Sequence, residues 1–365
     1  MWFPYFCKKW EKIFYSYIGV KNMAKIDELL SDIDIKKVSD IHITSGTKPK
    51  VRIDGKLIDV YEHTIPHGVV EEYIKDLAPD KYEEFLKNGE IDFKYDKNGL
   101  CNFRVNAFKC KGSYAICMRV IKAQIPKLAE LSNAQALKYF TELKDGLVLV
   151  TGPTGSGKST TLAAMVNEIN ILKEKHIITL EDPIEYIYDN KKSIINQREI
   201  GQDTRNYAMG LRAALRQDPD VILVGEMRDT ETMEIVMRAA QTGHLVFSTL
   251  HNMGAANSIY RIVNSFEAGY QNEIKIQLSS LLRGVVSQVL IPRESGEGRI
   301  AAMEIMVCTP GIKNLIRQGN YEQINSFIQM GSKYGMQTIE MDLRRMVSNK
   351  TISAEEYEKW IMNNK

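Results

Sequence analysis

The chain lacks three features that would place it in a specialised class: an excess of one charge, a long apolar run and paired cysteines. Among 365 residues, lysine plus arginine (48) nearly equals aspartate plus glutamate (46), so no global basic field points to nucleic acid as the main partner. The longest uncharged run, residues 239–260, contains too many polar side chains to cross a bilayer cheaply. We therefore expect no transmembrane helix.

The cysteines are few and scattered. They form no CxxC pair and follow no secretory leader pattern. Such usage is typical of a reducing cytoplasm and argues against a structural zinc site. The five residues are Cys7, Cys101, Cys110, Cys117 and Cys308.

Residues 1–22 differ in composition from the rest, because aromatic side chains alternate there with lysines. Two interpretations are open. The segment could anchor the chain at a membrane surface, or it could be upstream translation with Met23 as the real start. We favour the second, since MAKIDELL resembles an ordinary N-terminus.

The next part, residues 23–121, predicts a small α+β domain. Ile26, Leu29, Leu30 and Ile33 recur at helical spacing, and Asp54-Gly55 and Asn98-Gly99 are turn dipeptides of the kind found between antiparallel strands. Alternating apolar residues at 41–43 and 114–120 predict strands. Residues 122–133, which include Pro126, are the expected linker.

Residues 134–365 have a different pattern. Continuous apolar runs at 147–150, 177–180, 221–224 and 245–247 are separated by helical segments, which predicts a parallel sheet covered on both faces. After Ile274 the chain is expected to be mainly helical, with two β-like runs at 285–291 and 300–307. The predicted fold class is therefore α/β, with a small α+β domain first.

A phosphate-binding loop directly follows the first of these runs. Residues 152–159 fit GxxxxGK[ST], in which glycines let backbone N–H groups face the phosphates at a helix N-terminus. Lys158 is expected to reach the β- and γ-phosphates of a nucleotide, and the Ser159 hydroxyl to bind Mg²⁺. The expected nucleotide-binding residues are Gly152, Pro153, Thr154, Gly155, Ser156, Gly157, Lys158, Ser159 and Thr160.

Two groups of carboxylates close later apolar runs. Glu226 ends the run that starts at Asp220, as the acid of a Walker B element does, and is expected near the metal. Residues 181–185 contain three carboxylates, and either Glu181 or Glu185 could be the base that orients water. A solvated acidic loop is the competing interpretation.

The histidines and arginines are less informative by themselves. His244 and His251 lie at opposite ends of one predicted strand, without metal-ligand spacing to a partner. Arg104 and Arg119 fall in predicted strands of the first domain and are most simply solvated. Oligomeric P-loop enzymes, however, commonly need an arginine delivered from elsewhere.

Four segments taken together resemble the secretion and type IV pilus ATPase superfamily in order and spacing. They are residues 152–160 (GPTGSGKST), 179–186 (TLEDPIEY), 214–229 (ALRQDPDVILVGEMRD) and 242–251 (TGHLVFSTLH). Within it the chain is most similar to the retraction (twitching motility) ATPases, the PilT family. The assembly and type II secretion ATPases carry an extra N-terminal domain and a tetracysteine zinc insertion, neither of which is seen here.

This resemblance implies a PAS-like domain joined to a RecA-like ATPase domain, in a homohexameric ring with ATP between subunits. It implies that Lys158 and Ser159 bind phosphate and Mg²⁺, that Glu226 is the Walker B acid and that Glu185 is the base. It also makes His244 and His251 a histidine box and Arg104 and Arg119 candidate arginine fingers. A C-terminal motif close to AIRNLIRE departs from that pattern at Gly311, Lys313 and Gln318.

The expected function is therefore a Mg²⁺-dependent hexameric ATPase that powers pilus retraction. Its expected place is the cytoplasmic face of the inner membrane, on a pilus platform protein within the pilus machinery. Alternatives are an accessory retraction ATPase, another ATPase of the superfamily, a RecA-like nucleic-acid translocase and a nucleotide-binding regulator without turnover. Near-zero net charge weighs against the translocase.

Overall fold

The computed structural model describes residues 26–35, 37–53, 55–97, 102–121 and 125–364. The chain divides into two compact units, Met1–Ala123 and Gln124–Lys365. The N-terminal segment 1–22, the predicted turn at Asn98-Gly99 and Asp54 lie outside the described residues.

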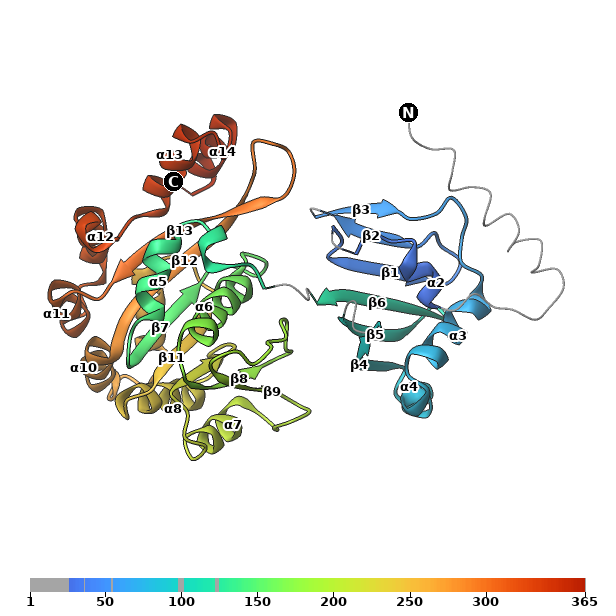
Figure 1. Ribbon diagram of the computed structural model, residues 1–365, viewed down its shortest axis with the longest axis horizontal. Helices are drawn as coiled ribbons and strands as arrows, with labels where there is room; N and C mark the ends of the chain where they lie inside the picture. Colours follow the sequence, from blue (N-terminus) through green and yellow to red (C-terminus); the bar gives the residue numbers. More distant parts are fainter. Residues whose placement is uncertain (1–25, 36, 54, 98–101, 122–124, 365) are drawn as a thin grey trace. The chain divides into compact units, whose positions relative to one another are not determined.

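The first unit is an antiparallel sheet with helices against it (Figure 1). Its strand order is β3-β2-β1-β6-β5-β4. The elements are α2 (Ile26–Ser31), β1 (Asp40–Thr44), β2 (Lys50–Ile53), β3 (Lys56–Asp59), α3 (His67–Leu77), η2 (Pro79–Lys81), α4 (Tyr82–Asn88), β4 (Glu90–Asp96), β5 (Asn102–Cys110) and β6 (Ser113–Ile121).

Alternation along the strands decides which face of this sheet is covered. In β5, Phe103, Val105 and Ala107 are buried in one cluster with apolar residues of α2, α3 and α4, whereas the residues between them are only half-buried. This period of two is the pattern of a strand with a single packed face. The helical spacing at Ile26 and the strands predicted at 41–43 and 114–120 are confirmed.

The second unit is built on a seven-stranded mixed sheet of order β13-β12-β7-β11-β10-β8-β9. Only the β12–β13 pairing is antiparallel. Its strands are β7 (Gly146–Thr151), β8 (His176–Glu181), β9 (Ile194–Glu199), β10 (Val221–Val224), β11 (Leu245–Leu250), β12 (Leu282–Pro292) and β13 (Arg299–Val307).

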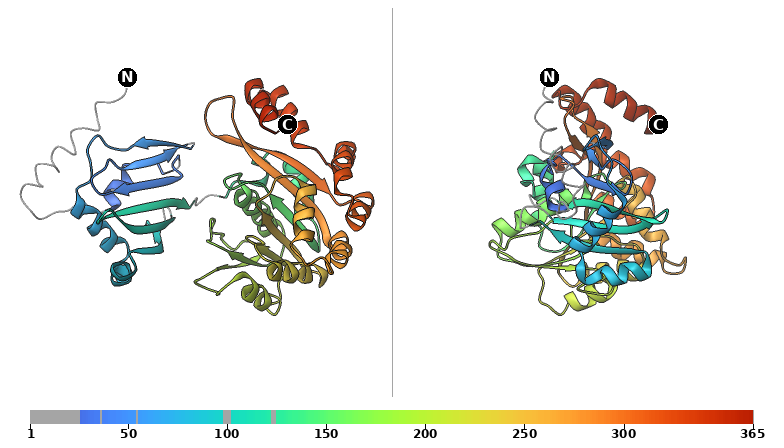
Figure 2. Two further views of the ribbon diagram at one scale, coloured as in Figure 1. Left: turned by 180° about the vertical axis from the view of Figure 1, so that it is seen from behind. Right: turned by 90° about the vertical axis from the view of Figure 1, so that its right-hand side faces the viewer.

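Helices cover both faces of this sheet (Figures 1 and 2). In β7, Leu147 and Leu149 join the core formed with α7 to α12, whereas Val148 and Val150 join the core formed with α5 and α6. The helices are η3 (Leu128–Glu130), α5 (Ala134–Thr141), α6 (Lys158–Leu172), α7 (Tyr207–Ala214), α8 (Thr230–Gln241), α9 (Ala255–Asn264), α10 (Gln271–Leu281), α11 (Pro310–Gln318), η4 (Tyr321–Gln323), α12 (Ile324–Met330), η5 (Ser332–Tyr334), α13 (Ile339–Ser348) and α14 (Ala354–Asn364). Burial on both sides explains why the central strands read as continuous apolar runs.

The four predicted parallel strands are present as β7, β8, β10 and β11, and the two later β-like runs are β12 and β13. The edge strand β9 was not predicted. Of its residues only Ile195 and Glu199 are buried, so it shows neither an apolar run nor an apolar alternation.

Of the segment predicted as a linker, residues 122–133, the structure describes residues 125–133, and these pack on the second unit. Leu128 is 3% exposed and joins the core around α5 and α6, and Ser132 Oγ donates to the Ala301 carbonyl of β13. The division between the units lies after Ala123, so residues 125–133 are part of the second unit and not a free connection.

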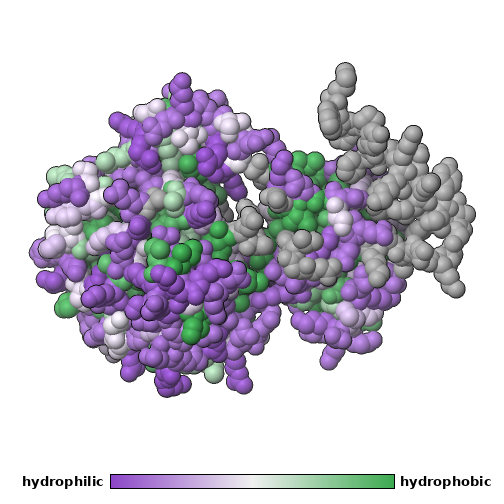
Figure 3. All heavy atoms as spheres, viewed as in Figure 1, coloured by the Kyte–Doolittle hydropathy of each residue, from purple (hydrophilic) through white to green (hydrophobic). Residues whose placement is uncertain are grey.

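The described surface of the second unit is mainly hydrophilic on the face shown in Figure 3, with separate small apolar areas. Among the residues that the structure describes, none of the helices has the length and apolar character that a bilayer crossing requires.

Candidate nucleotide site

The carboxyl ends of the parallel strands bring the predicted motifs to one edge of the second sheet. β7 runs into the loop 152–157, β8 into the acidic segment 181–186, β10 into Gly225 and Glu226, and β11 into His251. In open α/β sheets this edge is where ligands bind.

The phosphate loop has the backbone that its glycines permit. The φ angles of Gly152, Gly155 and Gly157 are +142°, +79° and +88°, values that other residues adopt only with strain. The loop leads directly into α6, whose first residue is Lys158. Its free N–H groups and the helix dipole together favour an anion at this point.

The Lys158 side chain folds back over its own loop. Its Nζ donates to the carbonyl oxygens of Gly152 (2.8 Å) and Pro153 (3.0 Å), and the residue is 9% exposed. Burial lowers the pKa of Lys158, and the nearby negative charges of Glu185 and Glu226 oppose that effect. Two of the predicted carboxylates therefore act electrostatically on the loop lysine.

Glu226 is 8% exposed and both of its carboxylate oxygens are engaged. One pairs with the Arg228 guanidinium, and the other lies 2.9 Å from His251 Nε2. Burial raises the pKa of Glu226, but the bonds from Arg228 and His251 outweigh burial, so the pKa lies below its ordinary value. The site therefore holds Glu226 as a carboxylate.

His251 also lies beside the phosphate loop, because its Nδ1 is 3.5 Å from Thr154 Oγ1. His244 is at the other end of β11, where its Nδ1 contacts the Ala239 carbonyl (2.9 Å) and Thr242 Oγ1 (3.1 Å). Six residues of strand separate the two histidines, which is about 20 Å. The structure thus brings His251, and not His244, to this site of the same chain.

The acidic segment presents its glutamates differently. Glu181 Oε1 accepts bonds from Thr179 Oγ1 (2.6 Å) and Gln197 Nε2 (3.2 Å), and burial raises the pKa of Glu181. Glu185 is exposed. Its neighbour Tyr186 is buried, with its hydroxyl 2.8 Å from Thr160 Oγ1 at the start of α6, which ties the acidic segment to the phosphate loop.

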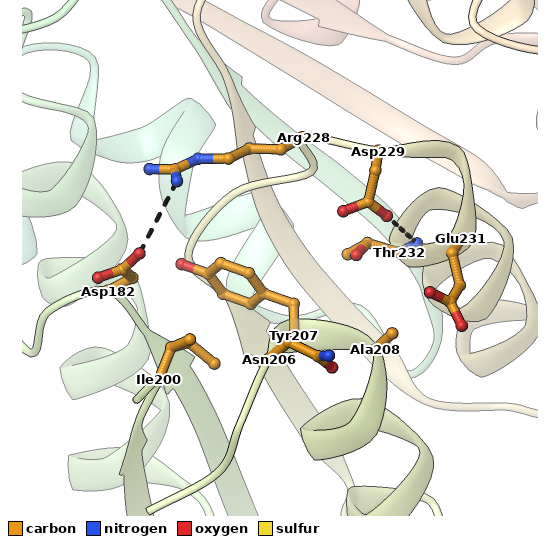
Figure 4. Close-up of a pocket in the computed structure, with 9 residues that line it drawn as sticks. All are labelled: Asp182, Ile200, Asn206, Tyr207, Ala208, Arg228, Asp229, Glu231 and Thr232. Carbon is orange, nitrogen blue, oxygen red and sulfur yellow. Dashed lines mark hydrogen bonds and ion pairs between the residues drawn. The ribbon is translucent and has the colours of Figure 1, made fainter. Parts of the chain in front are cut away.

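A pocket of about 240 Å³ lies next to Glu226 between α7 and α8 (Figure 4). Arg228 reaches across it toward Asp182 (3.8 Å), and the Tyr207 hydroxyl points to the space between them. Asp229 caps α8 by accepting the Thr232 N–H (2.7 Å). Arg228, which lines this pocket and pairs with Glu226, connects the two.

The chemistry of the donors fits a nucleotide with Mg²⁺. A cationic lysine and a helix N-terminus suit phosphates, and the Ser159 hydroxyl suits their metal ion. The carboxylates of Glu185 and Glu226 lie near the same lysine. No cluster of three or more His, Cys, Asp or Glu side chains placed for a metal ion occurs among the described residues. Mg²⁺ usually keeps waters and phosphates as ligands and takes only one or two groups from protein, and the Ser159 hydroxyl and the Glu226 carboxylate would be such groups.

Comparison with known proteins agrees with this geometry. Residues 21–359 match the family described as type II/IV secretion system protein. The type IV pilus retraction ATPase PilT of Pseudomonas aeruginosa is 44% identical, over 90% of this chain and 96% of that protein. A crystal structure of the pilus retraction motor PilT with bound ADP superposes with a TM-score of 0.84 at 42% identity, covering 92% of this chain and 96% of that one.

The chain belongs to the type II/IV secretion system protein family. The type IV pilus ATPase PilU of Pseudomonas aeruginosa is also similar to this secretion-family protein, at 35% identity over 91% of this chain and 87% of PilU. The α/β fold of the secretion-family chain is thus that of a solved PilT structure.

The two candidate arginine fingers of this secretion-family chain lie in the first unit. Arg104 of β5 and Arg119 of β6 face each other in register, and Arg119 Nε is 3.0 Å from Asp40 on β1. Arg119 keeps 70% of its side chain exposed. The ion pair with Asp40 therefore leaves most of the Arg119 side chain exposed.

Two further side chains of the site were not singled out from the sequence. Arg228 neutralises Glu226, and a cation two residues after the acid was the available signal. Tyr186 joins the acidic segment to α6, and no local pattern marks it, because its partner Thr160 is on another element.

Proposed function

We propose that this chain is a Mg²⁺-dependent ATPase that drives type IV pilus retraction as a homohexamer. One observation carries the proposal: Glu226 is held ionised beside Lys158, at the sheet edge where the phosphate loop begins. A loop of this kind binds nucleotide, and hydrolysis needs in addition a carboxylate at the metal and a group that positions water.

Lys158 would leave its two carbonyl acceptors to bind the β- and γ-phosphates. Ser159 and Glu226 would hold Mg²⁺, which neutralises phosphate charge when bound. Glu185 is the proposed base, because its side chain is exposed and its negative charge raises the pKa of Lys158. Glu181, which accepts hydrogen bonds from Thr179 and Gln197, would instead support the acidic segment. His251 would couple Glu226 to the loop residue Thr154.

Arg104 and Arg119 would come from a neighbouring copy of the chain and neutralise charge that develops on the transferred phosphoryl group. This role suits the exposed Arg119 and its half-buried neighbour Arg104, and it would make assembly of the ring necessary for turnover. The ring would act on a platform protein of the pilus machinery at the inner membrane. We also assign the first unit as PAS-like and the second as RecA-like, an assignment supported by the one-sided antiparallel sheet and the two-sided P-loop sheet.

The test is ATP hydrolysis by the protein eluted from a size-exclusion column, compared with Glu185→Gln and Glu226→Gln. We expect activity in a peak of about 250 kDa, six chains of 41.6 kDa, and a loss of at least about 100-fold in kcat in both variants with nucleotide binding retained. The control is Glu340→Gln, which changes an exposed carboxylate of α13 in the same way. A monomer that binds ATP without hydrolysing it would contradict the proposal.

A second candidate, an accessory retraction ATPase, is favoured by the similarity to PilU. Complementation separates the two. The chain should restore twitching to a strain that lacks its main retraction ATPase, and restoration only in a strain that lacks the accessory ATPase would favour the second role.

A further inference from the structure

The strand β12 runs beneath the phosphate loop, although it is far away in the sequence. It pairs in parallel with β7 up to Ser287, which lies opposite Thr151, the last residue of β7. Gln288 is therefore level with Gly152, where the loop begins. Neither the sequence motifs nor the proposed mechanism gives Gln288 a role.

The Gln288 side chain is fully buried and uses both ends of its amide. Nε2 donates to the Ser156 carbonyl (2.7 Å), and Oε1 accepts from Thr161 Oγ1 (2.9 Å). One side chain thus joins the loop to the first turn of α6. Both of its partners would be left unpaired in the interior without it, which is costly.

The close approach of β12 at Gln288 requires a glycine at position 152 and leaves little room for a side chain at position 157. A Cβ on Gly152 would lie 2.3 Å from the Gln288 carbonyl oxygen, and a Cβ on Gly157 would lie 3.2 Å from Gln288 Nε2. The first distance is impossible for real atoms. The loop therefore rests directly on β12 at this residue.

The bond to Ser156 fixes the direction of a peptide group. In a trans peptide the C=O of one residue and the N–H of the next point to opposite sides. Because Gln288 holds the Ser156 carbonyl toward β12, the N–H of Gly157 is directed away from β12, to the side open for a phosphate.

We propose that Gln288 is a positioning residue for the phosphate loop: its amide orients the Ser156–Gly157 peptide for phosphate binding and locks that orientation to α6 through Thr161. This inference rests on the proposed function, since it assumes that the loop binds nucleotide. It concerns affinity for phosphate groups, and Gln288 itself touches no substrate.

The test measures binding of a fluorescent ADP analogue to the full chain, with and without Mg²⁺, below the melting temperature of every variant. Gln288→Met keeps the size of the side chain and removes both hydrogen bonds. We expect its Kd to rise roughly tenfold or more, about 1.4 kcal/mol, in both conditions. Thr161→Val should cause a smaller rise, and the double variant should be no worse than Gln288→Met.

The matched control is Ser287→Ala, one residue earlier in β12, whose hydroxyl accepts the Gly254 N–H instead. It is expected to lower stability without raising Kd. Hydrogen exchange should show lost protection at residues 152–160 in Gln288→Met, and unchanged protection in β7 and β11.

Three outcomes decide the matter. If wild type binds no ADP, the proposed function fails. If wild type binds and folded Gln288→Met binds equally well, the positioning role is overturned while the function stands. If Ser287→Ala weakens binding as much as Gln288→Met, the effect is one of general strand stability and the inference is wrong.

Discussion

Asp342, a carboxylate that is 0% exposed, connects three segments of the second unit. Its Oδ2 accepts from the Met303 N–H of β13 (2.8 Å) and from Asn133 Nδ2 (2.9 Å), and its Oδ1 accepts from Arg345 Nε (3.1 Å). Asp342→Ala leaves the buried Met303 N–H, the half-buried Asn133 amide and the exposed Arg345 guanidinium without their acceptor. A buried donor left without its acceptor costs about 1–3 kcal/mol, and the pair with the exposed Arg345 guanidinium adds at most about 1 kcal/mol, so the expected loss is about 2–4 kcal/mol.

For a unit of this size that loss corresponds to a fall in Tm of roughly 4–16 °C. The assay is thermal and urea unfolding followed by circular dichroism. Asp342→Asn keeps the shape and one acceptor, so it should lie between wild type and Asp342→Ala. The control is Glu340→Ala on the same helix, whose pairing with Arg344 is exposed and should contribute at most about 0.5 kcal/mol. Equal losses for Asp342→Ala and Glu340→Ala would refute the reasoning.

Three shorter predictions concern other parts of the chain. Burial raises the pKa of Cys308 to about 12, so at pH 8 its thiolate fraction is far lower than that of an ordinary thiol. Mass spectrometry should therefore find Cys308 alkylated at least about 100-fold more slowly than the half-buried Cys110, and equal rates would contradict this. Tyr186→Phe removes the bond to Thr160 and should cost about 1 kcal/mol in urea unfolding, while an unchanged midpoint would show that the bond contributes nothing. His244→Ala should leave the Kd for ADP within about twofold of wild type, because this histidine is at the far end of β11; a tenfold rise would place it in the site.

The sequence predicted the parts of the fold that local pattern determines. Strands buried on both faces, such as Val221–Val224, appear as short apolar runs, and the glycines of the phosphate loop mark a backbone that few other residues can form. The edge strand Ile194–Glu199 has too few buried residues to give such a signal. Leu128 was assigned to a linker because Pro126 and a break in strand character dominate locally, although its side chain packs in the second core.

At the candidate site, too, local sequence pattern predicts some features and misses others. The motif residues follow from spacing, because each comes directly after a predicted strand. One hydrogen bond that distinguishes Glu181 from the exposed Glu185 comes from Gln197, which lies on the strand that was not predicted. The pairing of Gln288 with the phosphate loop spans 132 residues of sequence, and only the order of strands in the sheet brings them together.

The position of β7 in the sheet has a consequence for how the protein is made. β7 pairs on one side with β11 and on the other with β12, so the strand that carries the phosphate loop meets its neighbours only after about 100 and about 135 further residues have been added. A ribosome-bound chain that ends before residue 282 has one side of β7 unpaired, and its phosphate loop lacks the contact with Gln288 of β12. Nucleotide binding should therefore arise late in synthesis, only after the residues of β12 have been added.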